Sequence, residues 1–537
     1  MRQEILNIYV SLTNFLNLYF VEIPKTIKMK INGTKNSMLS VTAKTERRRE
    51  GKKFRQYLAA IAATIGPFAV GTVLAWTSPV EPLLTNITAH EPGPYLTQDQ
   101  ASWAGSLIAI GAVFGSLPAS WGADFVGRKT AIATLAIPFL ISWVIIIVAK
   151  SVELLYLARL IAGGVIGAVT ATVPMYIGEI AETSVRGELG SYIQLMVTMG
   201  ILYVYVIGSF VDYVMLNILC AIVPIVYLIF FMVVAPESPT FLMRKNRRKE
   251  AEQSLLVLRG DQYDIYSELD EIQEQIDEER KRQQSFKDLF SSKAVIKATI
   301  AVMGLLSFLS FSGINVVIFY AKKIFEAGGT KVPADLATII IGSVQVIMTY
   351  ASGLLVDRAG RRVLLLISDS IMALCMLALG TYFYAKENKY DVENFGWVPL
   401  VSLSVYISVF SLGFGPIPGI MMGELFSPEA KGVALGVVCI LASLLEFVVV
   451  KGFQNLVDWV NFGITFWIFA GFCVIGFLFV YFLVPETKNK SLQEIQDELS
   501  GIKKKKKKGK KVNGAQVTKT PIVVNQQLTT TNATNAV

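Results

Sequence analysis

The chain has 537 residues, of which 53% are hydrophobic and only 17% are charged, and its mean hydropathy is +0.51. A soluble protein of this length is not so apolar, so the lipid bilayer is the expected solvent for most of the chain. The formal net charge of +9 gathers outside the apolar runs, with no aromatic residues interleaved in the basic tail. We therefore expect contact with anionic lipid and no nucleic-acid partner.

The N-terminal segment, residues 1–56, precedes the first long apolar run. Its apolar stretch 5–23 is interrupted by polar residues such as Asn7 and Asn14 and lacks both the early positive cluster and the small-residue cleavage site of a signal peptide. We expect disorder here, with an interfacial helix as the alternative.

Twelve apolar runs are long enough to cross a bilayer, because a spanning helix needs about 20 apolar residues and leaves no backbone group unpaired in hydrocarbon. The predicted fold is therefore an all-α membrane protein with twelve transmembrane helices, six in the N-terminal half (57–235) and six in the C-terminal half (295–485). In chain order the runs cover residues 58–78, 103–121, 130–149, 154–177, 190–210, 214–235, 295–320, 337–356, 364–385, 397–422, 433–452 and 463–484.

Two further segments lie outside the apolar runs. Residues 236–294 are rich in charged residues with spaced Leu and Ile, which predicts a cytoplasmic linker of short amphipathic helices. Residues 486–537 carry the run Lys503 to Lys508 and then many Thr and Asn residues, which predicts a basic, disordered tail.

Lys and Arg concentrate before the first run, after the last and in the even-numbered loops, which predicts a multi-pass plasma-membrane protein with both termini in the cytoplasm. Asn86, followed by Thr88, is then a glycosylation acceptor in the first outside loop.

The only histidine, His90, lies in the same loop, so neither a histidine-based catalytic group nor a metal site or other cofactor is expected. The four cysteines, Cys220, Cys375, Cys439 and Cys473, fall within apolar runs and are expected to be small core residues.

Charged residues recur in the same order in both halves, at offsets of 233 to 249 residues. The recurring set is Asp124 with Asp357, Arg128 with Arg361 and Arg362, Glu179 with Glu424, Arg186 with Lys431, and Pro236-Glu237 with Pro485-Glu486. Such residues at cytoplasmic helix ends can form ion pairs in one conformation and release them in another. We therefore predict that Asp124, Arg128, Glu179, Arg186, Asp357, Arg361, Arg362, Glu424 and Lys431 form a conformational switch that holds an outward-open state. The alternative is that each charge only anchors a helix end at the lipid surface.

Several motifs within residues 55–498 resemble those of the sugar porter branch of the major facilitator superfamily, and more narrowly those of insect facilitated trehalose and glucose transporters. They include the repeated Asp-Gly-Arg segments, Trp76 to Pro79, Pro174 to Glu179, Gly313 to Asn315 and Gly415 to Pro418. The resemblance implies two six-helix bundles with a sugar bound between them, and transport rather than enzyme catalysis. We expect a monomer with a small sugar as its substrate.

A sugar is a ring of hydroxyl groups, so its site needs amide and hydroxyl side chains beside an aromatic surface. The resemblance and the pattern together name five candidate ligands: Gln194, Ser310, Ser312, Asn315 and Gln345. For Gln194, a helix–helix hydrogen bond is the alternative. Glycines and prolines in the tenth run, including Gly415, Pro416 and Pro418, predict a broken helix that acts as a gate. A fixed kink is the alternative.

Other positions depart from the family pattern. Leu309, Gly419, Ala442 and Ser443 stand where relatives carry amide or aromatic residues, and each lost hydrogen bond costs about 1 kcal/mol. A less hydroxylated solute, or a non-transporting sugar sensor, is therefore an alternative.

The first run contains no acidic residue of the kind that proton symporters of the family carry, which favours facilitated diffusion. Glu446 and Asp369, within the eleventh and ninth runs, have no assigned role.

Overall fold

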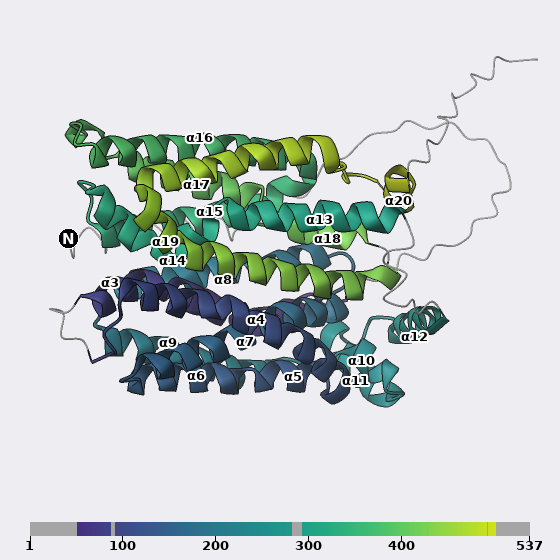
Figure 1. Cartoon of the computed structure of the whole chain (residues 1–537). Helices are drawn as coiled ribbons and strands as arrows, with labels where there is room; N and C mark the ends of the chain where they lie inside the picture. The colour runs from purple at the N-terminus through teal and green to yellow at the C-terminus, as the bar shows by residue number, and fades with distance from the viewer. Residues whose placement is uncertain (1–50, 87–91, 282–292, 427, 491, 501–537) are drawn as a thin grey trace, which may run out of the picture. The chain divides into compact units, whose positions relative to one another are not determined.

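The computed structural model describes residues 51–86, 92–281, 293–426, 428–490 and 492–500. The predictions made for the N-terminal segment and for the lysine run lie outside these residues. Every regular element in the described part of the chain is helical, as predicted. Figure 1 shows the helices of the first half and those of the second half as two groups whose long helices run in roughly the same direction.

The first half contains eight helices that make six spans. They are α2 (Phe54–Ala75), α3 (Thr77–Thr85), α4 (Gln98–Val126), α5 (Arg128–Thr134), α6 (Ala136–Val148), α7 (Val152–Ile180), α8 (Arg186–Gly208) and α9 (Tyr213–Val234). The first span continues through α3 to Thr85, seven residues beyond the predicted end at 78. Thr97 and Gln100 form a reciprocal capping box that begins α4, and Ser151 caps α7.

The second half contains seven helices and a short 3-10 turn. They are α13 (Lys293–Phe311), α14 (Ile314–Gly328), α15 (Ala334–Ala359), α16 (Arg361–Glu387), η3 (Glu393–Phe395), α17 (Val398–Leu412), α18 (Ile417–Leu425) and α19 (Pro428–Leu483). The predicted eleventh and twelfth spans are continuous in α19, where Asn461 breaks the helix with a φ of 72°. Eleven candidate spans within the described residues thus correspond to twelve crossings, because the last candidate, Gly436–Leu483, is long enough for two.

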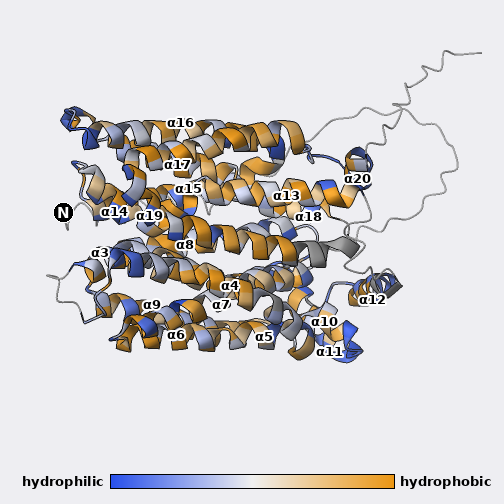
Figure 2. Ribbon diagram, viewed as in Figure 1, coloured by the Kyte–Doolittle hydropathy of each residue, from blue (hydrophilic) through white to orange (hydrophobic). Residues whose placement is uncertain are grey.

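Three short helices follow the first half: α10 (Pro239–Arg244), α11 (Arg248–Arg259) and α12 (Ile265–Lys281). Leu255 and Leu269, two of the spaced apolar residues of the predicted linker, are fully buried in a small core that the three helices share. We call the end of the molecule that carries these helices the linker end and the opposite end, near α3, the distal end (Figure 1). Figure 2 shows mostly hydrophobic residues along the long helices and more hydrophilic ones in α11 and α12.

The prediction of disorder throughout 486–537 was wrong for α20 (Leu492–Ser500). Leu492, Ile495 and Leu499 recur at steps of three or four, so they share one helix face, and the latter two are buried. Gln496 Nε2 donates a hydrogen bond of 2.6 Å to the Leu425 carbonyl at the end of α18. This segment is therefore a packed helix of the linker end.

The expected burial of the cysteines was correct for Cys220, Cys375 and Cys473, but Cys439 is exposed on α19.

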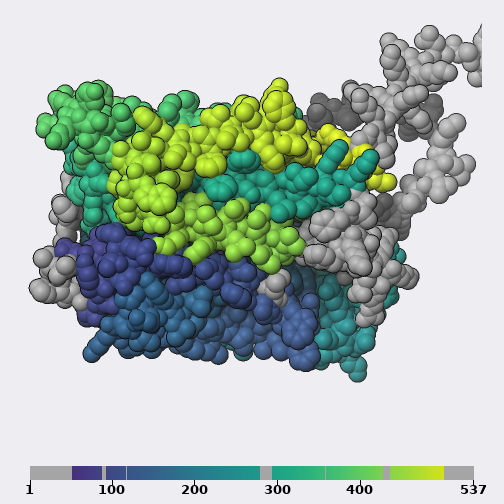
Figure 3. All heavy atoms as spheres, viewed as in Figure 1, coloured from purple at the N-terminus to yellow at the C-terminus, as the bar shows by residue number. Residues whose placement is uncertain are grey.

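Within the first half, α4 packs along α7 and α2 packs along α8. Within the second half, α16 packs along α17 and α19. The halves meet where α4 contacts α19, where α8 contacts α15 and where α3 contacts α14. Figure 3 shows the purple surface of α4 against the light green surface of α19.

Candidate substrate site and gates

The seventh span is broken at its centre, a feature that sequence reasoning missed. Gly313 has a φ of 89°, which a residue with a side chain rarely adopts, and it separates α13 from α14. Asn315 lies in the first turn of α14, directly after the break, and is half-buried. The Gly-Ile-Asn motif was the available signal, because a glycine within an apolar run marks a possible change of backbone direction.

The two candidate serines are both buried beside this break, with 2% and 1% of Ser310 and Ser312 exposed. Ser312 Oγ donates to the Leu309 carbonyl at 2.7 Å, and Tyr406 of α17 donates to Ser312 Oγ at 3.1 Å. The Ser312 hydroxyl therefore already has a donor and an acceptor within the protein, and it ties the seventh span to the tenth.

Gln194 on α8 and Gln345 on α15 lie on helices that pack across the boundary between the halves. A Cβ atom placed on Gly342 would lie 3.0 Å from the ring of Tyr205, and one placed on Gly353 would lie 3.7 Å from Ser191. These contacts define an antiparallel register in which Gln194 and Gln345 are separated by between one and two helical turns along the axis. Among the described residues, neither glutamine amide nor that of Asn315 has a hydrogen-bond partner.

The tenth span is broken, as its sequence predicts. The break falls between α17 and α18, where Gly413 leaves the helical region and Gly415 N–H donates to the Phe410 carbonyl at 2.8 Å. Pro416 and Pro418 begin α18, where a missing N–H costs no helical hydrogen bond. Gly419 is exposed, and a Cβ atom placed on it would meet nothing within 4 Å. The position where relatives place an aromatic residue is thus open space.

At the linker end of the first half, Arg128 is the centre of a buried charge cluster. Its guanidinium lies 2.7 Å from Asp124 and 3.0 Å from Glu179, and its side chain is 1% exposed. The carboxylate of Glu237 accepts hydrogen bonds from the backbone N–H groups of Arg128 and Lys129 at 2.9 and 3.0 Å. It thereby satisfies donors at the start of α5, where the helix dipole also favours negative charge.

The second half repeats this cluster in a more exposed form. Arg361 pairs with Glu424 at 2.9 Å, and their side chains are 11% and 28% exposed. Glu486 accepts hydrogen bonds from the N–H groups of Arg361 and Arg362, both at 3.1 Å, and from that of Lys488 at 2.9 Å. Burial alone would raise the pKa of Glu486, but these backbone donors outweigh it and bring the pKa below its ordinary value.

Glu237 and Glu486 were part of the repeated motifs but were not predicted as site residues. Of the other predicted switch residues, Arg186 is exposed, and its guanidinium contacts the Ala181 carbonyl at 3.4 Å rather than a carboxylate. Arg362 donates to the Tyr481 carbonyl within its own half. The side chains of Asp357 and Lys431 lie outside the described part of the structure. Between described side chains, no ion pair joins the two halves at the linker end.

At the distal end, by contrast, ion pairs do join the halves. Lys323 of α14 lies 2.7 Å from Glu81 of α3, and its ammonium also donates to Gln98 at 2.6 Å and to Gln454 of α19 at 2.7 Å. Only 3% of the Glu81 side chain is exposed. We call the polar contacts of Lys323 with these three residues the distal clamp.

A second ion pair crosses the same boundary. Lys451 of α19 lies 2.5 Å from Asp99 at the start of α4, donates to Ser102 Oγ at 2.8 Å, and covers the ring of Trp103. Sequence reasoning missed both ion pairs because Glu81, Asp99 and Lys323 lie beyond the predicted apolar runs and were treated as loop residues.

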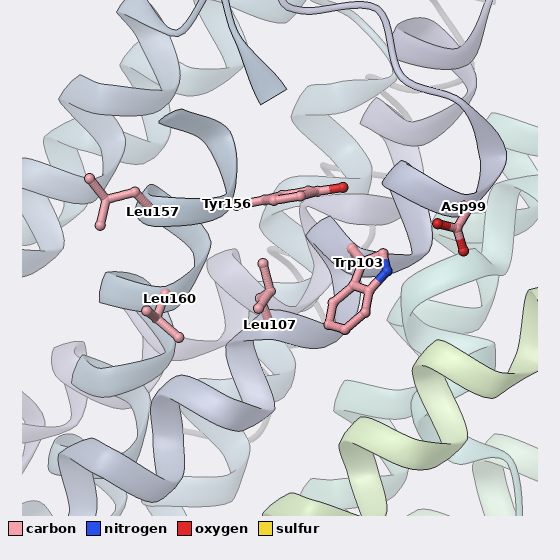
Figure 4. Close-up of a pocket in the computed structure, with 6 residues that line it drawn as sticks. All are labelled: Asp99, Trp103, Leu107, Tyr156, Leu157 and Leu160. Carbon is pink, nitrogen blue, oxygen red and sulfur yellow. The ribbon is translucent and has the colours of Figure 1, made fainter. Parts of the chain in front are cut away.

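A surface groove of about 530 Å³ lies beside this second pair, between α4 and α7 (Figure 4). Its walls are mainly apolar: Leu107, Leu157 and Leu160 lie with Trp103 and Tyr156, while Asp99 stands at one end. Leu157 and Leu160 are 47% and 36% exposed, as expected for side chains that face lipid. None of the predicted sugar ligands lines this groove, so it is not the predicted site.

Asn86, the predicted glycosylation acceptor, is exposed at the end of α3 near the distal end. Thr88, which completes the acceptor motif, lies outside the described residues. Modification of Asn86 therefore stays a prediction.

The fold and the paired clusters are those of a duplicated membrane transporter, and comparison with known proteins identifies the family. Residues 58–499 match the family model described as sugar (and other) transporter, and the chain belongs to this family. It is 39% identical over 446 residues to the facilitated trehalose transporter Tret1 of Bombyx mori, covering 83% of this chain and 87% of that one. Tret1 of Apis mellifera ligustica is 38% identical over 448 residues, with 83% and 88% covered.

Solved structures agree with this assignment. The partially occluded inward-open conformation of the xylose transporter XylE from E. coli superimposes with a TM-score of 0.67 and 26% identity, covering 81% of this chain and 99% of that one. The predicted major facilitator fold with two halves and the predicted transporter class are thus confirmed, and the family is one of transporters rather than enzymes.

Proposed function

We propose that this protein is a facilitative transporter of a sugar, trehalose or a hexose, that works by alternating access. The observation that carries the proposal is the position of three amide groups, those of Gln194, Asn315 and Gln345. They belong to α8, α14 and α15, helices that each contact a helix of the other half, and none of the three has a partner among the described residues. Unpaired amides inside a membrane protein are costly, so hydroxyl groups of a substrate are suitable partners for them.

The orientation follows from charge. The linker end carries most of the basic residues, so we assign it to the cytoplasm and the distal end to the outside of the plasma membrane. The distal clamp then closes the outer end, and the arrangement corresponds to an inward-facing state. The two relatives described above are facilitated trehalose transporters, and each aligns with 83% of this chain. This similarity supports the same substrate class here.

We further propose that the two linker-end clusters act as the switch. In the inward-facing arrangement each cluster pairs within its own half, and Arg186 has no carboxylate partner among the described residues. Closure of the linker end would bring the two halves together there and let Arg186 reach the acidic residues of the second half. The charges then favour the outward-open state, as the repeat in the sequence predicts.

Uptake of labelled trehalose and D-glucose into proteoliposomes that contain the purified protein tests both proposals. We expect saturable uptake, and we expect Arg186→Gln to lower the rate of uptake more than it weakens sugar binding measured by thermal stabilisation. Equal loss of rate and binding would contradict the switch. Absence of uptake with retained stabilisation by sugar would instead favour a sensor.

The open space at Gly419 supports a second candidate, transport of a less hydroxylated solute. A site without an aromatic wall and with Leu309 in place of an amide offers a sugar fewer contacts. Competition for uptake by a panel of polyols and deoxysugars distinguishes the candidates. Stronger competition by deoxysugars than by trehalose or glucose would favour the second.

A further inference from the structure

Asp369 is a buried acidic residue in α16 that the transport cycle described above does not use. Only 1% of the residue is exposed, and its Oδ2 atom has no hydrogen-bond partner among the described residues. The chain also contains a buried arginine, Arg159, but its guanidinium donates to the carbonyls of Ala104 and Val73 and to Thr77 Oγ1 at 3.0 to 3.2 Å. Three acceptors of the first half thus bind the charge of Arg159, whereas no described residue of the second half donates a hydrogen bond to Asp369 Oδ2.

The surroundings of Asp369 hold no positive charge among the described residues. The titratable groups near it are Tyr406 of α17, Cys473 of α19 and Cys375 of α16 itself. Phe308 of α13 and Asp369 Oδ2 both lie against Gly476 of α19. An isolated carboxylate in such surroundings is strongly disfavoured and takes up a proton instead. A metal ion does not fit, because hard cations need several oxygen ligands and no cluster of metal-ligating side chains occurs in the described part of the chain.

Asp369 also lies beside the tenth span, because α16 packs along α17, and α17 is hydrogen-bonded to the seventh span. Its neighbour in sequence, Ser368, donates to the Val409 carbonyl at 2.8 Å, close to the break at Gly413 in the tenth span. Tyr406, which is near Asp369, donates to the Ser312 carbonyl at 3.0 Å, next to the break at Gly313 in the seventh span. Ser368 and Tyr406 therefore connect the surroundings of Asp369 to both broken helices.

We propose that Asp369 is a proton-binding site within the second half, and that its protonation permits the packing of α13–α14 against α17–α18 seen here. Loss of the proton would place a negative charge beside α17 and oppose this packing, so the rate of conformational exchange would depend on pH. The proton need not cross the membrane with the substrate, so net transport still follows the substrate gradient. The effect on rate rests on the proposed transport function, whereas the proton site does not.

Infrared difference spectroscopy of the purified full-length protein between about pH 6 and about pH 9 tests the site directly. We expect the carbonyl band of a protonated carboxylic acid in the wild type, its loss in Asp369→Asn, and its retention at a shifted frequency in Asp369→Glu. Glu446→Gln, which removes a half-buried carboxyl group of α19, is the matched control and should keep the Asp369 band. A wild-type band that survives in Asp369→Asn would overturn the proposal, as would its loss in Glu446→Gln alone.

Uptake of trehalose and D-glucose at equal pH on both sides of the membrane gives the second readout. Wild-type uptake should fall severalfold as the pH rises over this interval, and Asp369→Asn, which resembles the protonated form, should be nearly independent of pH. An unchanged pH profile in Asp369→Asn would contradict control of the rate, and a dependence on Na⁺ would show a metal site instead. If no sugar is taken up at all, the transport proposal fails while the infrared band still decides whether Asp369 binds a proton.

Discussion

At the distal end, two ion pairs cross the boundary between the halves, whereas at the linker end the charge clusters of the described residues pair within each half. Lys323 with Glu81 and Lys451 with Asp99 are examples of the first kind. Arg128 with Glu179 and Arg361 with Glu424 are examples of the second. The first kind must break for the distal end to open, while the second kind can persist as each half moves. Charge in this protein therefore has two uses: it closes one end, and it keeps helix ends of each half together at the other.

The largest effect should come from Lys323→Met. Truncation of one member of a buried, hydrogen-bonded charge pair costs about 2–5 kcal/mol. Because Glu81 loses its cation, the substitution should destabilise the conformation in which the distal end is closed. We expect a cysteine introduced at Gly105, which faces Thr77 and Tyr320, to react at least about tenfold faster with a maleimide. The measurement uses protein without the four native cysteines.

Lys322→Met is the matched control for this substitution. Lys322 is the adjacent lysine and pairs with Asp335 at 2.7 Å, within the second half. Its loss should leave the reactivity at position 105 unchanged. Equal acceleration by both substitutions would show that the distal clamp does not hold the end closed.

The second comparison is between the two linker-end clusters. Arg128→Gln leaves the carboxylates of Glu179 and Asp124 without their cation, and removal of one partner from a buried ion pair costs about 3–5 kcal/mol. Arg361→Gln should lower the free energy of unfolding by less, since Arg361 and Glu424 are more exposed. Denaturant unfolding of the two purified variants measures the difference. An equal or larger loss for Arg361→Gln would contradict the greater importance of the first cluster for stability.

Between the two ends, the unpaired amides should affect affinity. Gln345→Ala removes an amide that we propose bonds to the substrate, at a cost of about 1 kcal/mol, so KM for the transported sugar should rise about fivefold. Ser352→Ala, on the same helix, removes a hydroxyl that already donates to the Leu412 carbonyl and should leave KM unchanged. Initial rates of uptake measure both. A rise in KM for Ser352→Ala alone would place the substrate elsewhere along α15.

The smallest expected effect is a loss of stability at acidic pH that depends on Glu486. Because the pKa of Glu486 is lower in the folded protein, its carboxylate stabilises the linker end above the ordinary pKa of a glutamic acid. This contribution is lost as the pH falls through the folded-state value. Thermal unfolding between about pH 5 and about pH 3 should therefore show a steeper loss for the wild type than for Glu486→Gln. Parallel losses would mean that the backbone donors of Arg361 and Arg362 do not stabilise the charged form.

The sequence by itself determined the membrane class, the twelve crossings, the duplication and the break at Pro416. Each of these depends on local composition or on spacing along the chain, such as the length of an apolar run or the recurrence of Asp, Gly and Arg. It also placed Arg128 and Glu179 on the same side of the membrane, because both lie at cytoplasmic ends of predicted spans. In the structure the two side chains form an ion pair.

Tertiary structure alone decided which charges meet across the halves and which stay within one. Lys322 and Lys323 are adjacent in sequence and alike in chemistry, yet one pairs within its half and the other across the boundary. Their difference arises because successive residues of a helix point about 100° apart, so the packing of α14 against α3 and α15 selects the partner of each. The same holds for Asp369, whose isolation follows from the neighbours that three other helices, α13, α17 and α19, place around it.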